Sequence, residues 1–328
     1  MSDTVKPFKI AIADAELQDL KQRITRTRWP ERETVNDWTQ GMPLAYTREL
    51  AEYWGEEYDW RRFERRLNEW PHFTTEINGI DIHFIHRRSP QQDALPLIIS
   101  HGWPGSVAEF HKVIDALADP VAHGGKAEDA FHVVAPSLPG YGFSGKPDTA
   151  GTNVEKIGAM WGLLMSRLGY TRYVALGGDW GSVITQSIGQ TETTHCAGIH
   201  VTMPIVAPDP ATMDDLSPQE QSALDAMAFY NDWDSGYSKQ QATRPQTLGY
   251  GLADSAVGQM AWIVEKFYAW TDCEQDGSSH PENILTRDEL LDNVMLYWLT
   301  HSATSSARLY WESFGKPDLR PLAVPVGC

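Results

Sequence analysis

The sequence of 328 residues has few cysteines and no long hydrophobic run. Its three cysteines, Cys196, Cys273 and Cys328, lie far apart and match neither the paired spacing of a zinc site nor an even-numbered disulfide framework. No stretch approaches the roughly 18 apolar residues that a membrane-spanning helix needs. The sequence therefore predicts a soluble protein of the reducing cytoplasm, with no metal site and no membrane anchor.

Basic residues are also scarce, with 27 Lys and Arg against 44 Asp and Glu and a formal net charge of −17. This charge would repel phosphate backbones and anionic membrane surfaces, which argues against nucleic acid as a partner. Hydrophobic residues make up 41% of the chain, enough for a sizeable core. No nucleotide-binding or metal-binding motif is present, so we expect no cofactor, and the sequence leaves homo-oligomerisation open.

The first half of the chain divides into two segments by hydrophobic pattern. Residues 1–72 mix charged and aromatic residues and predict a helical N-terminal extension that wraps the core, its first helix capped by Asp14. Residues 73–204 begin with a hairpin signal, Asn78-Gly79. They then carry apolar runs separated by helical segments, which predict a mostly parallel sheet covered on both faces. These runs are Leu95–Ser100, Phe131–Ala135, Tyr173–Leu176 and Cys196–Val201.

The second half loses this rhythm. Residues 205–315 show helical patterns, among them 256–270 and 290–310, with no strand between them, and predict an inserted helical lid. Residues 316–328 contain the run Pro321–Val326, which we expect to be the start of the returning core strand. The fold class predicted is therefore α/β.

The strongest chemical signal is Gly177-Gly178-Asp179-Trp180-Gly181, which follows one predicted strand and precedes a helical segment from Ser182. A nucleophile exposed on so sharp a turn needs small neighbours at minus two and plus two, which Gly177 and Gly181 provide. The usual nucleophile at this position is serine. An aspartate there would instead attack carbon and form an ester, which predicts an alkylating electrophile as substrate.

Two further loops stand where this arrangement requires them. His101-Gly102-Trp103-Pro104-Gly105 follows the strand that ends at Ser100, and the turn-rich Leu138–Ser144 follows the next strand. The backbone amides of Trp103 and Trp180 are the natural pair for an oxyanion hole. We predict a substrate-binding surface formed by His101, Gly102, Trp103, Pro104 and Trp180.

On these motifs the chain resembles the epoxide hydrolases of the α/β-hydrolase family, in the microsomal-like branch with an extra N-terminal domain. The resemblance spans the whole chain and includes the stretches around Arg28-Trp29-Pro30 and Trp60-Arg61-Arg62. It implies an α/β-hydrolase fold with a helical lid and an N-terminal helical extension. It also implies that small apolar epoxides are opened to vicinal diols through an ester on Asp179, with water as co-substrate.

The resemblance extends to two lid tyrosines that would donate hydrogen bonds to the epoxide oxygen. Tyr237 lies in a matching segment, Gly236–Thr247, and Tyr310 in a shorter one, Ser306–Trp311. Without this context a tyrosine in a helical lid would be read as packing. Trp103 and Trp180 are expected to line an apolar pocket, whereas we expect Trp270 to be a core residue.

The chain departs from the family pattern at its end. Members finish the cycle with a water molecule that a histidine activates. An acidic residue orients this histidine, and it lies on the loop after the strand that here would be Leu322–Val326. Because the sequence given ends at Cys328, we expect this acid and histidine to lie beyond it, and none of the eleven histidines matches the position. We therefore expect the 328 residues given to carry out the alkylation of Asp179 and to accumulate the ester.

Two other functions compete with this interpretation. A haloalkane dehalogenase shares the elbow aspartate followed by tryptophan, but the tyrosine segments and the N-terminal extension argue against it. A non-catalytic, degenerate relative that binds an apolar small molecule would explain the missing histidine, but not the intact elbow and lid.

Overall fold

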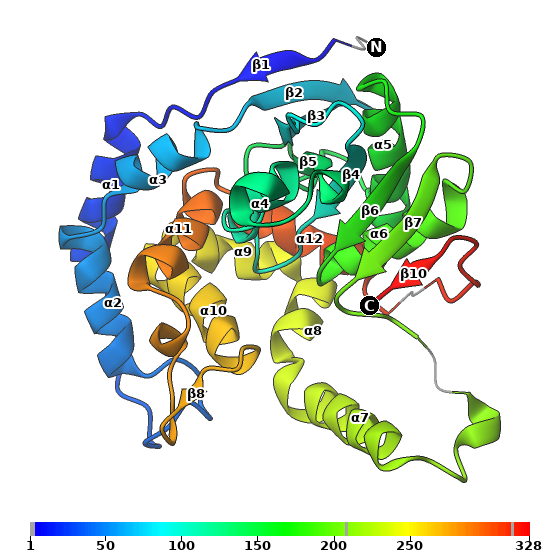
Figure 1. Ribbon diagram of the computed structural model, residues 1–328. Coiled ribbons are helices and arrows are strands. Elements are labelled where there is room, and N and C mark those ends of the chain that lie inside the picture. The colour runs from blue at the N-terminus through cyan, green and yellow to red at the C-terminus, as the bar shows by residue number, and fades with distance from the viewer. Residues whose placement is uncertain (1–3, 207–208, 316–317) are drawn as a thin grey trace.

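The computed structural model describes residues 4–206, 209–315 and 318–328. The strands of its main sheet are β1 (Lys6–Phe8), β2 (His72–Ile77), β3 (Ile80–Arg87), β4 (Leu95–Ser100), β5 (Phe131–Pro136), β6 (Tyr173–Gly177), β7 (Cys196–Val201) and β10 (Val326–Gly327). Their order in the sheet is β1-β2-β3-β5-β4-β6-β7-β10 (Figure 1). The first three strands pair antiparallel, as does β3 with β5, whereas β5, β4, β6, β7 and β10 pair in parallel. The predicted mostly parallel sheet is confirmed.

The hairpin between β2 and β3 forms at the predicted turn. Asn78 has φ of 53° and Gly79 of 79°, and the flanking residues Ile77 and Ile80 pair directly. Positive φ at both central residues is the mark of a type I′ turn, whose twist matches that of the strands. The two-residue signal in the sequence was therefore sufficient to fix the register of this hairpin.

Helices cover the parallel part of the sheet. α5 (Val154–Arg167) and α6 (Trp180–Thr191) pack against each other, and α6 lies along β4, β6 and β7, while α4 (Ile114–Ala118) packs on β3 and β5. The central strands are buried because they are covered in this way, with Ile98, Val134 and Ala175 at most 1% exposed. Short 3₁₀ segments are η1 (Val107–Phe110), η2 (Pro120–His123), η3 (Ala127–Asp129), η4 (Pro210–Thr212) and η6 (Pro281–Asn283).

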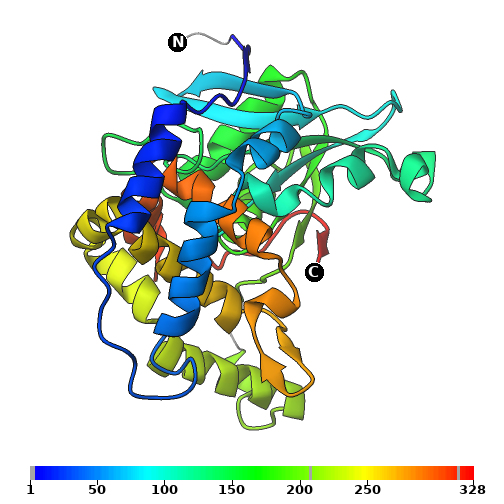
Figure 2. The same ribbon diagram turned by 90° about the vertical axis from the view of Figure 1, so that its left-hand side faces the viewer.

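The N-terminal segment extends the sheet and then packs on helices from the second half of the chain. β1 forms the edge strand, and α1 (Asp14–Thr25), α2 (Leu44–Glu56) and α3 (Trp60–Leu67) follow it. In Figure 2 the blue helices α1 and α2 cross in front of the yellow and orange helices. The prediction that Asp14 caps α1 is wrong, because Ala13 occupies the cap position and Asp14 is the first helical residue.

The remaining helices lie at the carboxyl ends of the parallel strands (Figure 1). They are α7 (Pro218–Phe229), the π-helical turn η5 (Tyr230–Asp234), α8 (Gly236–Thr243), α9 (Pro245–Asp254), α10 (Ala256–Ala269), α11 (Arg287–Trp298) and α12 (Ala303–Ser313). A short hairpin, β8 (Glu274–Gln275) with β9 (Ser278–Ser279), interrupts them. The expectation that 205–315 contains no strand is therefore wrong in this detail.

The helical pattern over 290–310 belongs to two helices and not to one. α11 ends at Trp298 and α12 begins at Ala303, and between them His301 has φ of 53°. The hydroxyl of Thr300 donates to the carbonyl of Leu296 at 2.6 Å, so side-chain hydrogen bonds compete with the helical ones here. The break turns the chain and sends α12 across α8 and α9.

The chain returns to the sheet later than predicted. β10 begins at Val326 and pairs with Ile199 and His200 of β7, whereas the sequence pattern placed the strand over 321–326. Pro321 and Pro325 have no backbone N–H to donate, which delays regular pairing. The expected boundary at residue 316 lies outside the described residues.

Candidate active site

The turn between β6 and α6 presents Asp179 to a cavity. Asp179 has φ of 50° and ψ of −127°, a conformation outside the regions that non-glycine residues favour. A Cβ on Gly177 would lie 2.0 Å from the carbonyl oxygen of Gly181, and one on Gly181 would lie 2.0 Å from that of Ser100. The glycine spacing read from the sequence is thus a steric requirement of this turn.

Backbone amides hold the Asp179 carboxylate in place. The amide of Trp103 donates to Oδ1 of Asp179 at 2.8 Å, and the amide of Trp180 also donates to this carboxylate. Burial raises the pKa of Asp179 to about 6, and the two amide donors limit the rise. The carboxylate is therefore ionised at neutral pH, and the amide of Trp103 fixes its Oδ1 atom.

The loop that carries Trp103 is shaped by His101. The Nε2 atom of His101 accepts from the amide of Leu138 at 3.2 Å, so its Nδ1 carries the proton and donates to the carbonyl of Gly102 at 3.0 Å. Burial lowers the pKa of His101 to about 4, which keeps the ring neutral. A Cβ on Gly102 would lie 2.2 Å from Oδ1 of Asp179. His101 and Gly102 thus allow the close approach of this loop to the nucleophile.

An apolar cavity of about 590 Å³ opens above Asp179. Its lining consists of Val154, Asp179, Trp180, Val183, Met203, Ile205, Tyr230, Tyr237, Trp270, Tyr310, Ser313, Phe314 and Gly315. Asp179 is the single ionised group in this lining, and no described lining residue is a histidine. The predicted substrate-binding residues His101, Gly102, Trp103 and Pro104 are not part of this lining, whereas the predicted Trp180 is.

Trp270 corrects one expectation. It is 38% exposed and lines the cavity, with its ring 5.0 Å from that of Tyr237, so it is not a core residue. Trp103 takes the position behind the tyrosines instead, stacked on Tyr237 at 5.1 Å. Of the two tryptophans expected to line an apolar pocket, Trp180 is part of the cavity lining, whereas Trp103 is not, because it packs against Tyr237 and Tyr310.

The two lid tyrosines meet across the cavity from Asp179. Tyr237 on α8 and Tyr310 on α12 have ring centroids 5.8 Å apart, and Tyr310 also packs on Trp180 at 4.9 Å. Among the described residues the Tyr310 hydroxyl is buried and makes no hydrogen bond of normal geometry, although the Tyr237 hydroxyl lies close enough to influence its pKa. Burial, with the charge of Asp179 added, raises the pKa of Tyr310 well above 10, so it remains a donor. An unpaired buried donor is costly unless a ligand occupies it.

Sequence reasoning missed Tyr230. Its hydroxyl lies 3.2 Å from that of Tyr237 and donates to Oγ of Ser238 at 3.1 Å. Burial and then Tyr230 raise the pKa of Tyr237, so this phenol also stays protonated. The seven-residue spacing gave no signal for this contact, because Tyr230 lies in η5 and Tyr237 in α8, with Ser235 between the two segments.

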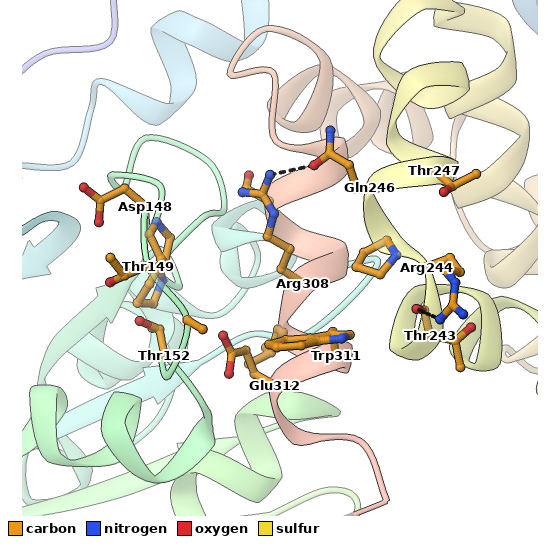
Figure 3. Close-up of a pocket in the computed structure, with 16 residues that line it drawn as sticks. Asp148, Thr149, Thr152, Thr243, Arg244, Gln246, Thr247, Arg308, Trp311 and Glu312 are labelled. Carbon is orange, nitrogen blue, oxygen red and sulfur yellow. Dashed lines mark hydrogen bonds between the residues drawn. The ribbon is translucent and has the colours of Figure 1, made fainter.

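A second cavity lies on the other side of α12. It measures about 570 Å³ and has a mixed lining that includes Arg308 and Glu312 of α12 together with Thr149 and Arg244. Figure 3 shows Arg308 reaching toward Gln246, to which it donates at 3.0 Å. This cavity contains neither Asp179 nor the tyrosines, so α12 separates it from the reactive group.

Comparisons with known proteins agree on one family. The family model described as "Epoxide hydrolase N terminus" matches residues 5–110, and the one described as "alpha/beta hydrolase fold" matches residues 96–248. A protein of Stigmatella aurantiaca whose name places it among the epoxide hydrolases is 55% identical over 98% of this chain and 73% of its own length. Epoxide hydrolase 1 of Oryctolagus cuniculus is 36% identical over 96% of this chain and 74% of its own length. The crystallised Aspergillus niger epoxide hydrolase superposes with a TM-score of 0.84 at 32% identity, covering 94% of this chain and 78% of that one.

Proposed function

This chain belongs to the epoxide hydrolases of the α/β-hydrolase fold, and we propose that it opens epoxides by alkylating Asp179 while Tyr237 and Tyr310 stabilise the departing oxygen. The observation that carries this proposal is the pairing of an ionised carboxylate with two protonated phenols across one apolar cavity. A serine-type acyl transfer does not need phenols on the opposite wall, whereas ring opening does.

In the first step a carboxylate oxygen of Asp179 attacks an epoxide carbon. The new C–O bond forms as the ring C–O bond breaks, and the electron pair moves to the epoxide oxygen. Hydrogen bonds from Tyr237 and Tyr310 stabilise that oxygen as charge develops on it. The unpaired Tyr310 hydroxyl supports this role, because the substrate oxygen would give it the acceptor that it lacks.

In the second step water attacks the ester carbonyl carbon of Asp179, the bond from that carbon to the alkyl oxygen breaks, and the Asp179 carboxylate is restored. The protons of the water pass to the alkyl oxygen and to the alkoxide formed in the first step, so a vicinal diol leaves. The oxygen that becomes negative belongs to Asp179 itself and lies at the amide of Trp103, with the Trp180 amide as second donor. These two amides are therefore our proposed oxyanion hole. Because no described residue of the cavity lining is a histidine, we propose that the polypeptide of these 328 residues forms the ester faster than it hydrolyses it.

The cavity lining supports an apolar epoxide as substrate. Apart from Asp179 and the tyrosines its walls are Val154, Val183, Met203 and other apolar or aromatic side chains. Such walls offer binding free energy in proportion to the apolar area they cover and few partners for additional polar groups. We propose small aryl or alkyl epoxides as the substrates.

We also propose that the helices of residues 205–315 act as a lid over the core of residues 73–204. Residues 1–72 would then be the N-terminal extension.

We propose that the protein works in the reducing cytoplasm. All three cysteines are free, which fits a reducing cytoplasm. Within the described part of the chain no helix has the length and apolar character to cross a bilayer.

Intact mass and peptide mapping after incubation with styrene oxide test the proposal. An adduct of one substrate mass is expected on the peptide that contains Asp179, and none is expected in Asp179→Asn. Asp215→Asn, which changes an exposed carboxylate in the same way, is the matched control and should keep the adduct. An adduct elsewhere, or none on folded protein, contradicts the assignment of Asp179, and release of halide from a haloalkane would favour a dehalogenase.

A further inference from the structure

A buried ammonium lies directly behind one of the ring-opening tyrosines. Lys266 on α10 is 6% exposed, and its Nζ atom lies 4.8 Å from the ring centroid of Tyr237 and 5.3 Å from that of Trp270. Lysine is rarely buried to this degree unless it is paired. Neither the alkylation nor the hydrolysis as described above uses this residue.

Two carboxylates fix the position of the ammonium. Nζ of Lys266 lies 2.9 Å from Oδ1 of Asp234 and 2.9 Å from Oε2 of Glu265. Asp234 also accepts from Nε1 of Trp270 at 2.7 Å, so it connects the ammonium to the cavity wall. These partners offset the cost of burying the charge and leave the ammonium over the aromatic faces.

We propose that Lys266 is a positioning residue that strengthens Tyr237 as the hydrogen-bond donor to the epoxide oxygen. A cation over a phenol ring is attracted more strongly as negative charge grows on that ring. The ring gains negative charge when its hydroxyl hydrogen moves toward the epoxide oxygen in the transition state. The interaction is therefore stronger in the transition state than in the ground state, which is the condition for faster chemistry. This inference rests on the proposed role of Tyr237.

The charges around Lys266 come from three segments. Asp234 belongs to η5 and Glu265 to α10, and Asp37 of the N-terminal segment lines the same hollow as Lys266 and Tyr237. Asp179 faces the other side of Tyr237 across the cavity. Carboxylates near the ring oppose the effect of the ammonium, so removing one of them while keeping Lys266 is informative.

A competing explanation is that Lys266 only keeps the rings of Tyr237 and Trp270 in place. The two roles differ in what they require of the phenol. A packing role depends on the aromatic ring, which phenylalanine also has, whereas the proposed role depends on the hydroxyl. A double-mutant cycle with Tyr237→Phe therefore separates them.

The first experiment measures the single-turnover rate of ester formation on Asp179, by rapid quench and mass spectrometry, over a range of styrene oxide concentrations. Lys266→Met should lower the maximal rate on the order of 10-fold with little change in the half-saturating concentration. In the Tyr237→Phe background the same substitution should have no effect. Lys239→Met is the matched control, since Lys239 lies on the helix of Tyr237 but is exposed, and its Nζ atom donates to the carbonyl of Asn231. A 10-fold loss that persists in the Tyr237→Phe background, or no loss at all, overturns the proposal.

A second pair of variants keeps the test valid if Lys266→Met does not fold. Lys266→Arg retains a cation over the ring and should keep most of the rate. Glu265→Gln retains an acceptor oxygen for Lys266 but removes a negative charge, so ester formation should be as fast as in the wild type or faster. A slower Glu265→Gln enzyme would mean that the cluster acts as a clamp and would overturn the proposal. Absence of the ester in the wild type would instead refute the proposed function itself.

Discussion

Replacing the nucleophile should make the folded protein more stable. Asp179→Asn removes a charge from the cavity and keeps the shape and the acceptor oxygen of the side chain. The position has φ of 50°, which asparagine tolerates better than most residues. The substitution therefore isolates the electrostatic cost of holding a carboxylate at this turn.

The magnitude follows from the pKa of Asp179, which burial raises from 3.8 to about 6. Because the folded state binds the proton more tightly than the unfolded state, the stability that Asp179 contributes is fully present below pH 3.8 and is lost as the pH rises through about 6. At about 1.36 kcal/mol per pH unit, the ionised group costs roughly 3 kcal/mol at pH 8. Contact of the carboxylate with solvent in the cavity brings the expected gain to roughly 2 to 3 kcal/mol, or on the order of 5 °C in Tm for a chain of this size.

Thermal unfolding at several pH values between 4 and 8 measures this gain. The difference in Tm between Asp179→Asn and the wild type should be small near pH 4, grow up to about pH 7 and then remain constant. The exposed Asp215→Asn should show no such growth. If Asp179→Asn has the same Tm as the wild type at pH 8, or a difference that does not depend on pH, the electrostatic reasoning is refuted.

Three further predictions concern the same site. The rate of ester formation should fall as the pH drops through about 6, because only the ionised Asp179 attacks, and a rate independent of pH between 5 and 8 would contradict this. Tyr237→Phe and Tyr310→Phe should each slow ester formation on the order of 100-fold while leaving Tm nearly unchanged, since the rings still pack; unchanged rates in both would remove the tyrosines from the mechanism. Gly181→Ala should cost about 3 kcal/mol or more in stability, because its Cβ would lie 2.0 Å from the carbonyl oxygen of Ser100, and a urea unfolding curve like that of the wild type would show that the turn can relax.

The sequence determined those features that depend on neighbours in the chain. The hairpin at Asn78-Gly79 was readable because positive φ at both central residues is a local property of its turn. The elbow at Asp179 was readable because a Cβ on Gly177 would meet the carbonyl of Gly181 four residues on, whereas Gly181 must be small because of Ser100 in β4. The mostly parallel sheet was readable, since apolar runs separated by helical segments are typical of one, but the order of its strands was not. The amide pair of Trp103 and Trp180 followed from the positions of two strand ends in the same sheet.

The tertiary structure decided what depends on contacts between distant segments. The break between α11 and α12 was not readable, because an apolar helical pattern continues across a turn that hydroxyl side chains and a positive φ produce. The exposure of Trp270 to the cavity and the place of Lys266 over Tyr237 depend on how α8 and α10 pack. A side chain's type limits what it can do, but its partners are set by the packing of elements that lie far apart in the chain, and these decide whether a buried lysine or tryptophan contributes to the core or to the reaction.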